Sequence, residues 1–555
     1  MSAESSTSHI GDDRGHSGDD RGSEAAWGTG APWWAQRTDV PTAPPVATGR
    51  PQLGGVAPDP ASDVWQSPTV PPLPVRSASW WTARRTVAAV GWVVIAALLA
   101  GSAAWGWGEV QAALSRAGQA QGVPLVPAQR DAAEPVPASA SEIVVRNGDP
   151  NDPAQRVVVA ALRDVDSFWK RTYRRIDAQP YRSISGGFYA FGNGETPPCT
   201  DDPQQVAGNA YYCAEADVIA WDQQRLIPRL RARYGDLGIG LVIAHEWGHA
   251  VQIRAGVVDE PTIFMEQQAD CYAGAWVADA RRRNGFFEVT DASLDRAMTG
   301  FLELRDPVGM TTAATPGAHG TAFDRIRAFQ EGVQGGATRC SAYRVDALPL
   351  VGINFQSYDD YATQGNLPLA DALDLTTKDL ADFWGSQVEA LGGDAGVSQP
   401  NVRLTDTPAT CARSVQLAAR VRYCPSTNEI TVSQKNATSA HDQIGDFAVS
   451  ALVGIGWGAA VLSNSDRLPT GARARQDAST CLAGAWTRSV FAADRTGAQL
   501  SLSPGDLDEA VTALMVMRSG RTDADRARGT DWGTGFERVA AYRRGFTDGL
   551  SACVR

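Results

Sequence analysis

The chain of 555 residues has no cysteine in its first 198 positions, and all eight of its cysteines come later. It also lacks an excess of lysine and arginine, because its formal net charge is −12. A nucleic-acid binder needs clustered lysine and arginine to neutralise phosphates, so the charge argues against that class of partner. What remains, 43% apolar and 20% charged residues, is ordinary for a globular protein with a buried core.

The N-terminal part has little aliphatic material. Residues 1–80 hold 11 of the 32 prolines, and such a composition cannot bury enough surface to offset chain entropy, so we expect a disordered tail. The 23 residues 86–108 then carry no charge and are long enough to span a bilayer. Arg84 and Arg85 precede them and Glu109 follows. The positive-inside rule therefore predicts a single-pass membrane protein with a cytoplasmic N-terminus and extracytoplasmic later domains.

A cleaved signal peptide is the alternative interpretation of residues 86–108, but its apolar region would be shorter and nearer the N-terminus. Residues 109–140 are rich in alanine and proline and are expected to form a linker.

An internal repeat follows the linker. Residues 271–276, Cys-Tyr-Ala-Gly-Ala-Trp, recur at 481–486 as Cys-Leu-Ala-Gly-Ala-Trp, 210 positions later. The other cysteines of the first copy recur at nearly the same spacing. A period of this length indicates a duplicated domain, so we predict two homologous domains in tandem, 141–345 and 346–555.

The cysteines are expected to form disulfides, because an even number on one side of a membrane segment indicates an oxidising compartment. Buried free thiols are the alternative. Four cysteines per copy allow three pairings, and the sequence does not decide among them. We favour pairs that clip a loop before a strand or tie a helix to the end of its domain: Cys199–Cys213, Cys271–Cys340, Cys411–Cys424 and Cys481–Cys553.

The first copy contains the pattern H-E-x-x-H, with His245, Glu246 and His249 in an apolar stretch predicted to be helical from near 236 to 256. Spacing i, i+4 places both imidazoles on one helical face, close enough to share a metal ion. Zn²⁺ suits two imidazoles and a carboxylate, with a fourth position left for water. Glu246 is placed to take a proton from that water, as a catalytic base.

A carboxylate for the third position follows on a second predicted helix, 261–283. Glu266 and Asp270 are again i, i+4 and share a face. Glu266 is the candidate third ligand, and Asp270 the acceptor that orients a ligand histidine. The alternative, ordinary core or surface side chains, would bury two imidazoles and Glu246 in an apolar helix at considerable cost.

Two further features have open interpretations. Residues 217–221 have strand character, and we expect either an edge that pairs with extended substrate or an inner structural strand. His319 is a candidate donor to the oxyanion of a tetrahedral intermediate, with a loop or capping role as the alternative.

These motifs resemble the putative neutral zinc metallopeptidase family of bacteria, which is similar to the gluzincins. The matching segments are 211–222, 245–252, 266–276 and 319–321. The resemblance covers 141–345 well and 346–555 as a degenerate copy. It implies an α+β, zincin-like domain that hydrolyses peptide bonds, with zinc held by His245, His249 and Glu266 and with Glu246 catalytic. The chain departs from the family in having Ala250 where relatives often have a further histidine, and in carrying the second copy.

The second copy has lost the candidate chemistry. The positions 210 residues after the three ligands, the base and Asp270 hold other residues: Ile455, Gly456, Ala459, Gln476 and Thr480. We therefore predict one zinc ion, in the first domain, and a non-catalytic second domain. The expected function is a membrane-anchored, extracytoplasmic zinc peptidase acting on peptides or proteins. The alternative is an extracytoplasmic binding or scaffold module with structural zinc, which would need a fourth protein ligand. Oligomeric state is not predicted.

Overall fold

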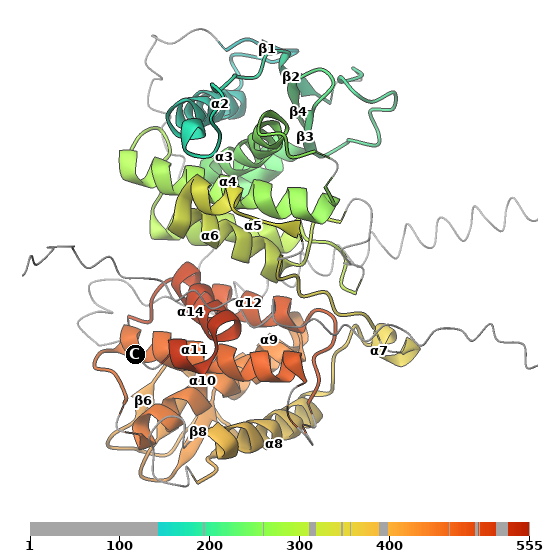
Figure 1. Ribbon diagram of the computed structural model, residues 1–555. Coiled ribbons are helices and arrows are strands. Elements are labelled where there is room, and N and C mark those ends of the chain that lie inside the picture. Colours follow the sequence, from blue (N-terminus) through green and yellow to red (C-terminus); the bar gives the residue numbers. More distant parts are fainter. Residues whose placement is uncertain are drawn as a thin grey trace, which may run out of the picture. The chain divides into compact units, whose positions relative to one another are not determined.

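The computed structural model describes residues 143–553 except 193–194, 259, 310–317, 346–347, 356, 388–397, 466, 494, 496–497, 499 and 518–530. The expected tail, membrane segment and linker, 1–80, 86–108 and 109–140, lie outside the described residues. Helices predominate and two small sheets accompany them, which confirms the predicted α+β class (Figure 1).

The sheet of the first half has the order β1-β2-β4-β3. Its strands are β1 (Val145–Arg146), β2 (Gly187–Phe191), β3 (Ala210–Cys213) and β4 (Val218–Asp222). β4 is parallel to β2 and antiparallel to β3, and all five of its residues are buried. Of the two interpretations of 217–221, the inner strand is therefore correct. Among the described residues β3 pairs with β4 alone, so β3 is the edge.

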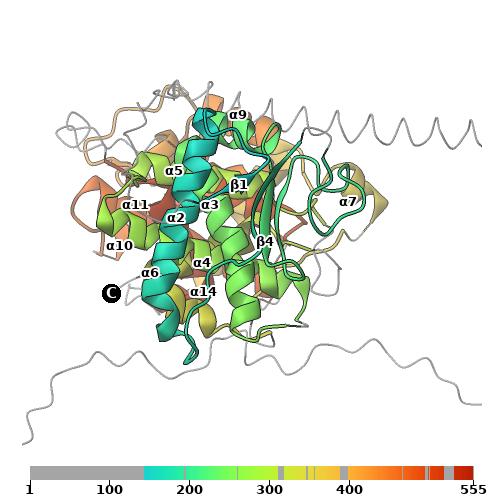
Figure 2. The same cartoon turned by 90° about the horizontal axis from the view of Figure 1, so that it is seen from above.

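The first half also contains four long helices and a shorter one: α2 (Pro153–Thr172), α3 (Leu226–Arg254), α4 (Thr262–Arg283), α5 (Asp291–Glu303) and α6 (Ala322–Ser341). α3 contacts α2 on one side and strands β3 and β4 on the other, an arrangement that can be followed in Figure 2. α4 packs between α3 and α6. The central helix α3 therefore has α4 and the edge strand β3 among its neighbours, and a site can be built from these three elements.

Local sequence signals place the two motif helices. Gly235 has a φ of 73°, in the left-handed region, and breaks α3, so the segment that carries the H-E-x-x-H pattern starts at Asp236. α4 follows Pro261 and ends at Asn284, which takes a left-handed conformation with φ 49°. Both predicted helices are confirmed, to within two residues at each end.

The second half has a similar order of elements. α8 (Leu369–Gln387) precedes a sheet, and α10 (Asp446–Asn464), α11 (Ala472–Ala492), α12 (Asp506–Val516) and α14 (Gly535–Asp548) follow it. The sheet consists of β5 (Asn401–Leu404), β6 (Val415–Gln416), β7 (Arg422–Cys424) and β8 (Glu429–Val432) in the order β5-β8-β7-β6. Here β8 is parallel to β5 and antiparallel to β7, as β4 is to β2 and β3. Two short helices complete this half, α7 (Tyr358–Ala362) and α9 (Gln434–Gln443). α9 lies between β8 and Gly445, as the first part of α3 lies between β4 and the break at Gly235.

Four disulfides join the cysteines in the favoured pairs: Cys199–Cys213, Cys271–Cys340, Cys411–Cys424 and Cys481–Cys553. Free cysteines are absent from the described residues. The second pair ties α4 to α6, the helices that flank the candidate site, and the fourth ties α11 to the segment after α14. The cysteines therefore hold together the same kind of helix pair in each half.

One described helix, α10, is long and apolar enough to cross a membrane by length and composition. It is almost wholly buried and packs against α8, α9, α11 and α12. Because a central core helix has the same composition, α10 gives little support to a membrane span. The span at 86–108 stays a prediction.

Candidate metal centre

Three side chains from α3 and α4 converge on one point: His245, His249 and Glu266. The Nε2 atoms of the two histidines are 3.2 Å apart. Glu266 Oε2 lies 3.1 Å from His245 Nε2, and Glu266 Oε1 lies 3.4 Å from His249 Nε2. Tetrahedral zinc with bonds of about 2.0–2.1 Å holds its ligand atoms roughly 3.3 Å apart. The three groups therefore have the spacing that one zinc ion requires.

The other ring nitrogens show why a cation fits between these groups. His245 Nδ1 lies 2.8 Å from Asp270 Oδ1, and His249 Nδ1 lies 3.0 Å from Gln252 Oε1. Gln252 is fixed in turn, because its Nε2 donates to the carbonyl of Met265 at 2.7 Å. Oxygen acceptors at both Nδ1 atoms favour the tautomer with the proton there, which leaves a lone pair on each Nε2. Two lone pairs and a carboxylate that face one another form a cation site.

Helix packing brings the ligands together. Gly248 lies against Ala269 of α4, and a Cβ at Gly248 would be 2.9 Å from the Cα of Ala269. Only glycine permits this close approach. His245 and His249 project from α3, and Glu266 projects from α4 beside them. The contact between the two helices thus sets the distance between the histidines and the carboxylate.

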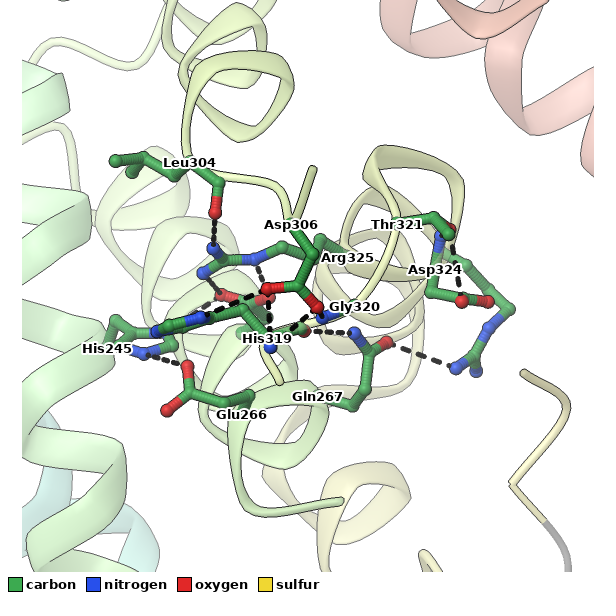
Figure 3. A network of polar contacts seen from close by, with 12 residues as sticks. His245, Glu266, Gln267, Leu304, Asp306, His319, Gly320, Thr321, Asp324 and Arg325 are labelled. Carbon is green, nitrogen blue, oxygen red and sulfur yellow. Dashed lines mark hydrogen bonds and ion pairs between the residues drawn. The ribbon is translucent and has the colours of Figure 1, made fainter. Parts of the chain in front are cut away.

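Asp270 is wholly buried and pairs with Arg325 of α6. Arg325 Nε donates to Asp270 Oδ2 at 2.8 Å, Nη2 donates to Oδ1 at 3.0 Å, and Nη1 donates to the carbonyl of Leu304 at 2.6 Å (Figure 3). Burial opposes ionisation of Asp270, but Arg325 and His245 hold its pKa below its ordinary value. An ionised Asp270 accepts the Nδ1–H of His245 and fixes the ring.

Arg325 and Gln252 were not among the predicted site residues. Arg325 ends the segment Gly-Thr-Ala-Phe-Asp-Arg, 320–325, which recurs as Gly-Thr-Gly-Phe-Glu-Arg at 533–538. A basic residue that recurs in both copies, at 325 and 538, was the available signal.

The electrostatics of the centre favour positive charge. Burial would lower the pKa of His245, yet Asp270 and Glu266 raise it to about 10. Burial would raise the pKa of Glu266, yet hydrogen bonds from both histidines hold it well below its ordinary value. The two acidic groups therefore stay ionised and stabilise either protons on the imidazoles or a metal cation between them.

Glu246 lies in the wall of a cavity of about 830 Å³ that the three ligand residues also line. The side chain is buried, and its burial raises the pKa of its carboxyl, although the nearby histidines act in the opposite direction. The backbone of Tyr212, on the edge strand β3, also forms a hydrogen bond with it. Apolar side chains from α3 and α5, among them Leu241 and Phe301, line the same cavity. The base candidate and an edge strand therefore lie together at the metal centre.

His319 also lines this cavity, with about half of its side chain exposed. Its backbone N–H and that of Gly320 donate to Asp306, and its Nδ1 lies 3.3 Å from Asp306 Oδ1 (Figure 3). Gln267 Nε2 donates to its carbonyl at 3.1 Å. The structure thus brings His319 to the site and holds its loop in place. Its role toward an oxyanion stays a prediction.

Residues 101–343 match the model of a family described as "Putative neutral zinc metallopeptidase". The match bears out the predicted resemblance over this part of the chain. The match contains every residue of the metal centre and ends before the second half. The family implies zinc and points to peptidase chemistry.

Three relatives are uncharacterized proteins by name, one from Mycobacterium bovis and two from strains of Mycobacterium tuberculosis. Each is 26% identical over 213 residues, which cover 34% of this chain and 70% of the relative. No solved structure gives a significant match.

Proposed function

We propose that the chain is a zinc-dependent peptidase, in which His245, His249 and Glu266 hold the metal and Glu246 is the general base. The observation that carries this proposal is the convergence of three ligand atoms, 3.1 to 3.4 Å apart, beside a buried carboxylate in a large cavity. Zinc bound there supplies a polarised water and a Lewis acid for the scissile carbonyl.

The protein's own groups would act around that centre. Glu246 would accept the proton of the attacking water and return it to the leaving amine, and its buried position in the cavity wall suits both steps. The edge strand β3 offers backbone groups to an extended peptide. His319, held at the cavity by Asp306, would donate to the oxyanion.

A structural zinc site in a binding or scaffold module is the second candidate. Such a site is closed by four protein ligands. The described residues bring only three converging side chains to this point, and the nearby Cys271 is tied to Cys340. Coordination with one open position favours the catalytic role.

We also propose that the second half is a degenerate duplicate, 346–555 after 141–345, and that it binds no catalytic zinc. Its support is the shared order of elements and the parallel–antiparallel pattern of β8 and β4. The positions that correspond to the ligands hold residues that cannot coordinate zinc in this way, Ile455, Ala459 and Gln476.

The location is a further proposal. A single span at 86–108 with the N-terminus in the cytoplasm would place the peptidase outside the cytoplasm, facing peptide or protein substrates there. Four disulfides in the region after this span support an oxidising compartment.

The experiment compares the full-length chain with Glu246→Gln in zinc content and in cleavage of a peptide library. We expect one zinc per chain in both and cleavage only by the wild type, with a loss of several orders of magnitude in kcat. Cleavage by Glu246→Gln at the wild-type rate would refute the mechanism. Zinc retained without any cleavage by the wild type would favour the structural alternative.

A further inference from the structure

A carboxylate of the second half reaches the first half close to the metal centre. Asp508, on α12, is buried and makes two contacts across this boundary. Its Oδ1 accepts the backbone N–H of Phe323, at the start of α6, at 2.9 Å. Its Oδ2 accepts Nη1 of Arg305, a residue of the cavity wall, at 2.7 Å.

Both contacts adjoin Arg325. Phe323 lies two residues before Arg325 on α6, and Arg305 directly follows Leu304, whose carbonyl accepts Nη1 of Arg325. Asp508 therefore connects the start of α6 to the segment after α5, and Arg325 connects the same two segments. A closed ring of contacts thus links five residues, Asp508, Phe323, Arg325, Leu304 and Arg305, and the Arg325 guanidinium also holds Asp270.

We propose that Asp508 is a positioning residue of the metal centre. By fixing the start of α6 and the segment after α5, it fixes the guanidinium of Arg325, which orients Asp270, which in turn orients the imidazole of His245. The second half is then a working part of the metal centre, and α12 is the element through which it acts.

The physical basis is the sensitivity of a metal site to the direction of its ligands. Groups that orient a ligand histidine typically contribute 10- to 100-fold in metal affinity. Arg325 has many rotamers, and it serves this purpose only while both ends of its hydrogen-bond set are fixed. Asp508 also places a negative charge at the N-terminus of α6, where the helix dipole stabilises it.

The chain offers a matched control. Asp295, on α5 of the first half, caps α14 of the second half: its carboxylate oxygens accept the N–H groups of Gly535 and Phe536, both at 2.8 Å. Asp295 thus also joins the two halves, but the helix it caps, α14, carries no candidate zinc ligand. Loss of either aspartate weakens the boundary, and only Asp508 is connected to Arg325.

The experiment uses the full-length chain as wild type, Asp508→Ala and Asp295→Ala. Zinc affinity is measured by competition with a chromophoric chelator, and thermal unfolding is recorded on the same samples. We expect the zinc Kd of Asp508→Ala to rise about tenfold, with that of Asp295→Ala unchanged and with similar losses in Tm. Equal zinc affinities in the two variants would overturn the proposal, because the boundary would then act only through stability.

If Asp508→Ala does not fold, the milder variant Asp508→Asn still tests the proposal. Asp508→Asn keeps an acceptor for Phe323 and loses the ion pair with Arg305, so its zinc Kd should rise by a smaller factor than that of Asp508→Ala. An unchanged Kd in Asp508→Asn, with Asp508→Ala unfolded, would also count against the proposal.

This proposal rests on the zinc site of the proposed function, but its zinc readout is independent of peptidase activity. A wild type that binds zinc and cleaves nothing would refute the peptidase while leaving the affinity comparison valid. Where cleavage is seen, Asp508→Ala should lose kcat/KM and Asp295→Ala should retain it.

Discussion

The helix pairs α3–α4 and α10–α11 have the same packing and different chemistry. Gly248 lies against Ala269 in the first pair, and Gly458 lies against Ser479 in the second. The indole of Trp276 donates to Asp164, and that of Trp486 donates to Asp379, both at 2.7 Å. Packing contacts of this kind depend on size and shape, so they persist when the polar residues between them change.

At the position that corresponds to Glu266, Gln476 forms two hydrogen bonds within the second half. Gln476 Oε1 accepts the N–H of Ala418 at 2.8 Å, and its Nε2 donates to Thr480 at 2.9 Å. Gly456 corresponds to Glu246, and the side chains of Ile430 and Val421 occupy the space beside it. A neutral amide and apolar side chains therefore replace the charges, and the second half has an ordinary core at this point.

One arginine remains in the second half without its carboxylate. Arg538 corresponds to Arg325, and its three hydrogen bonds within the described residues go to carbonyl oxygens, those of Leu514, Gly533 and Met517. Burial lowers its pKa to about 10. A buried arginine is stabilised far better by a carboxylate. The two arginines thus have different partners: a carboxylate for Arg325, and carbonyl oxygens for Arg538.

The largest expected difference lies in the ligands themselves. His245→Ala removes one of three ligands and should lose both zinc and cleavage. Ile455→Ala, at the corresponding position, should keep both and reduce the free energy of unfolding by about 2–5 kcal/mol, because it leaves a cavity in a buried core. Zinc per chain and denaturant unfolding measure the two effects. Zinc loss from folded Ile455→Ala would break the comparison.

A smaller effect is expected from the group that orients His245. Asp270→Asn should raise the zinc Kd about 10- to 100-fold, because a neutral amide is a weaker acceptor for the imidazole and a weaker partner for Arg325. Thr480→Ala, its counterpart, should leave the Kd unchanged. Chelator competition measures both. An unaffected Kd in Asp270→Asn would show that the 2.8 Å contact with His245 does not orient the ring.

Substitutions that affect only packing should reduce the free energy of unfolding by similar amounts in the two halves. A Cβ at Gly274 would lie 2.1 Å from the carbonyl oxygen of Phe329, and one at Gly484 would lie 1.9 Å from that of Tyr542. Gly274→Ala and Gly484→Ala should each reduce the free energy of unfolding by about 2 kcal/mol or more. Urea denaturation measures this, and a tolerated alanine in one half only would show that the halves pack differently.

The last prediction is a pH dependence that belongs to the second half. Burial and the nearby Asp446 raise the pKa of Glu509 to about 8, from an ordinary 4.5. Its contribution to stability is thus fully present below pH 4.5 and is lost as the pH rises through about 8. Glu509→Gln should flatten the fall in Tm between pH 5 and 8. Parallel Tm profiles for variant and wild type would contradict this assignment.

Much of the candidate site was predictable because its residues lie at short, regular spacings in the sequence. The i, i+4 pairs on two helices placed His245 and His249 on one face and Glu266 and Asp270 on another, and glycine and asparagine marked the helix ends. Arg325 was not predictable, because it is 55 positions from Asp270 and their contact depends on how α6 packs on α4.

The sequence by itself determined the types of the candidate ligands, their helical spacing and the different residues at the corresponding positions of the second half. The tertiary structure decided that β3 rather than β4 is the edge strand and that Asp508 contacts the segments around Arg325. The reason is physical: spacing along a helix is fixed by its 3.6-residue turn, whereas contacts between distant elements follow from the packing of whole surfaces.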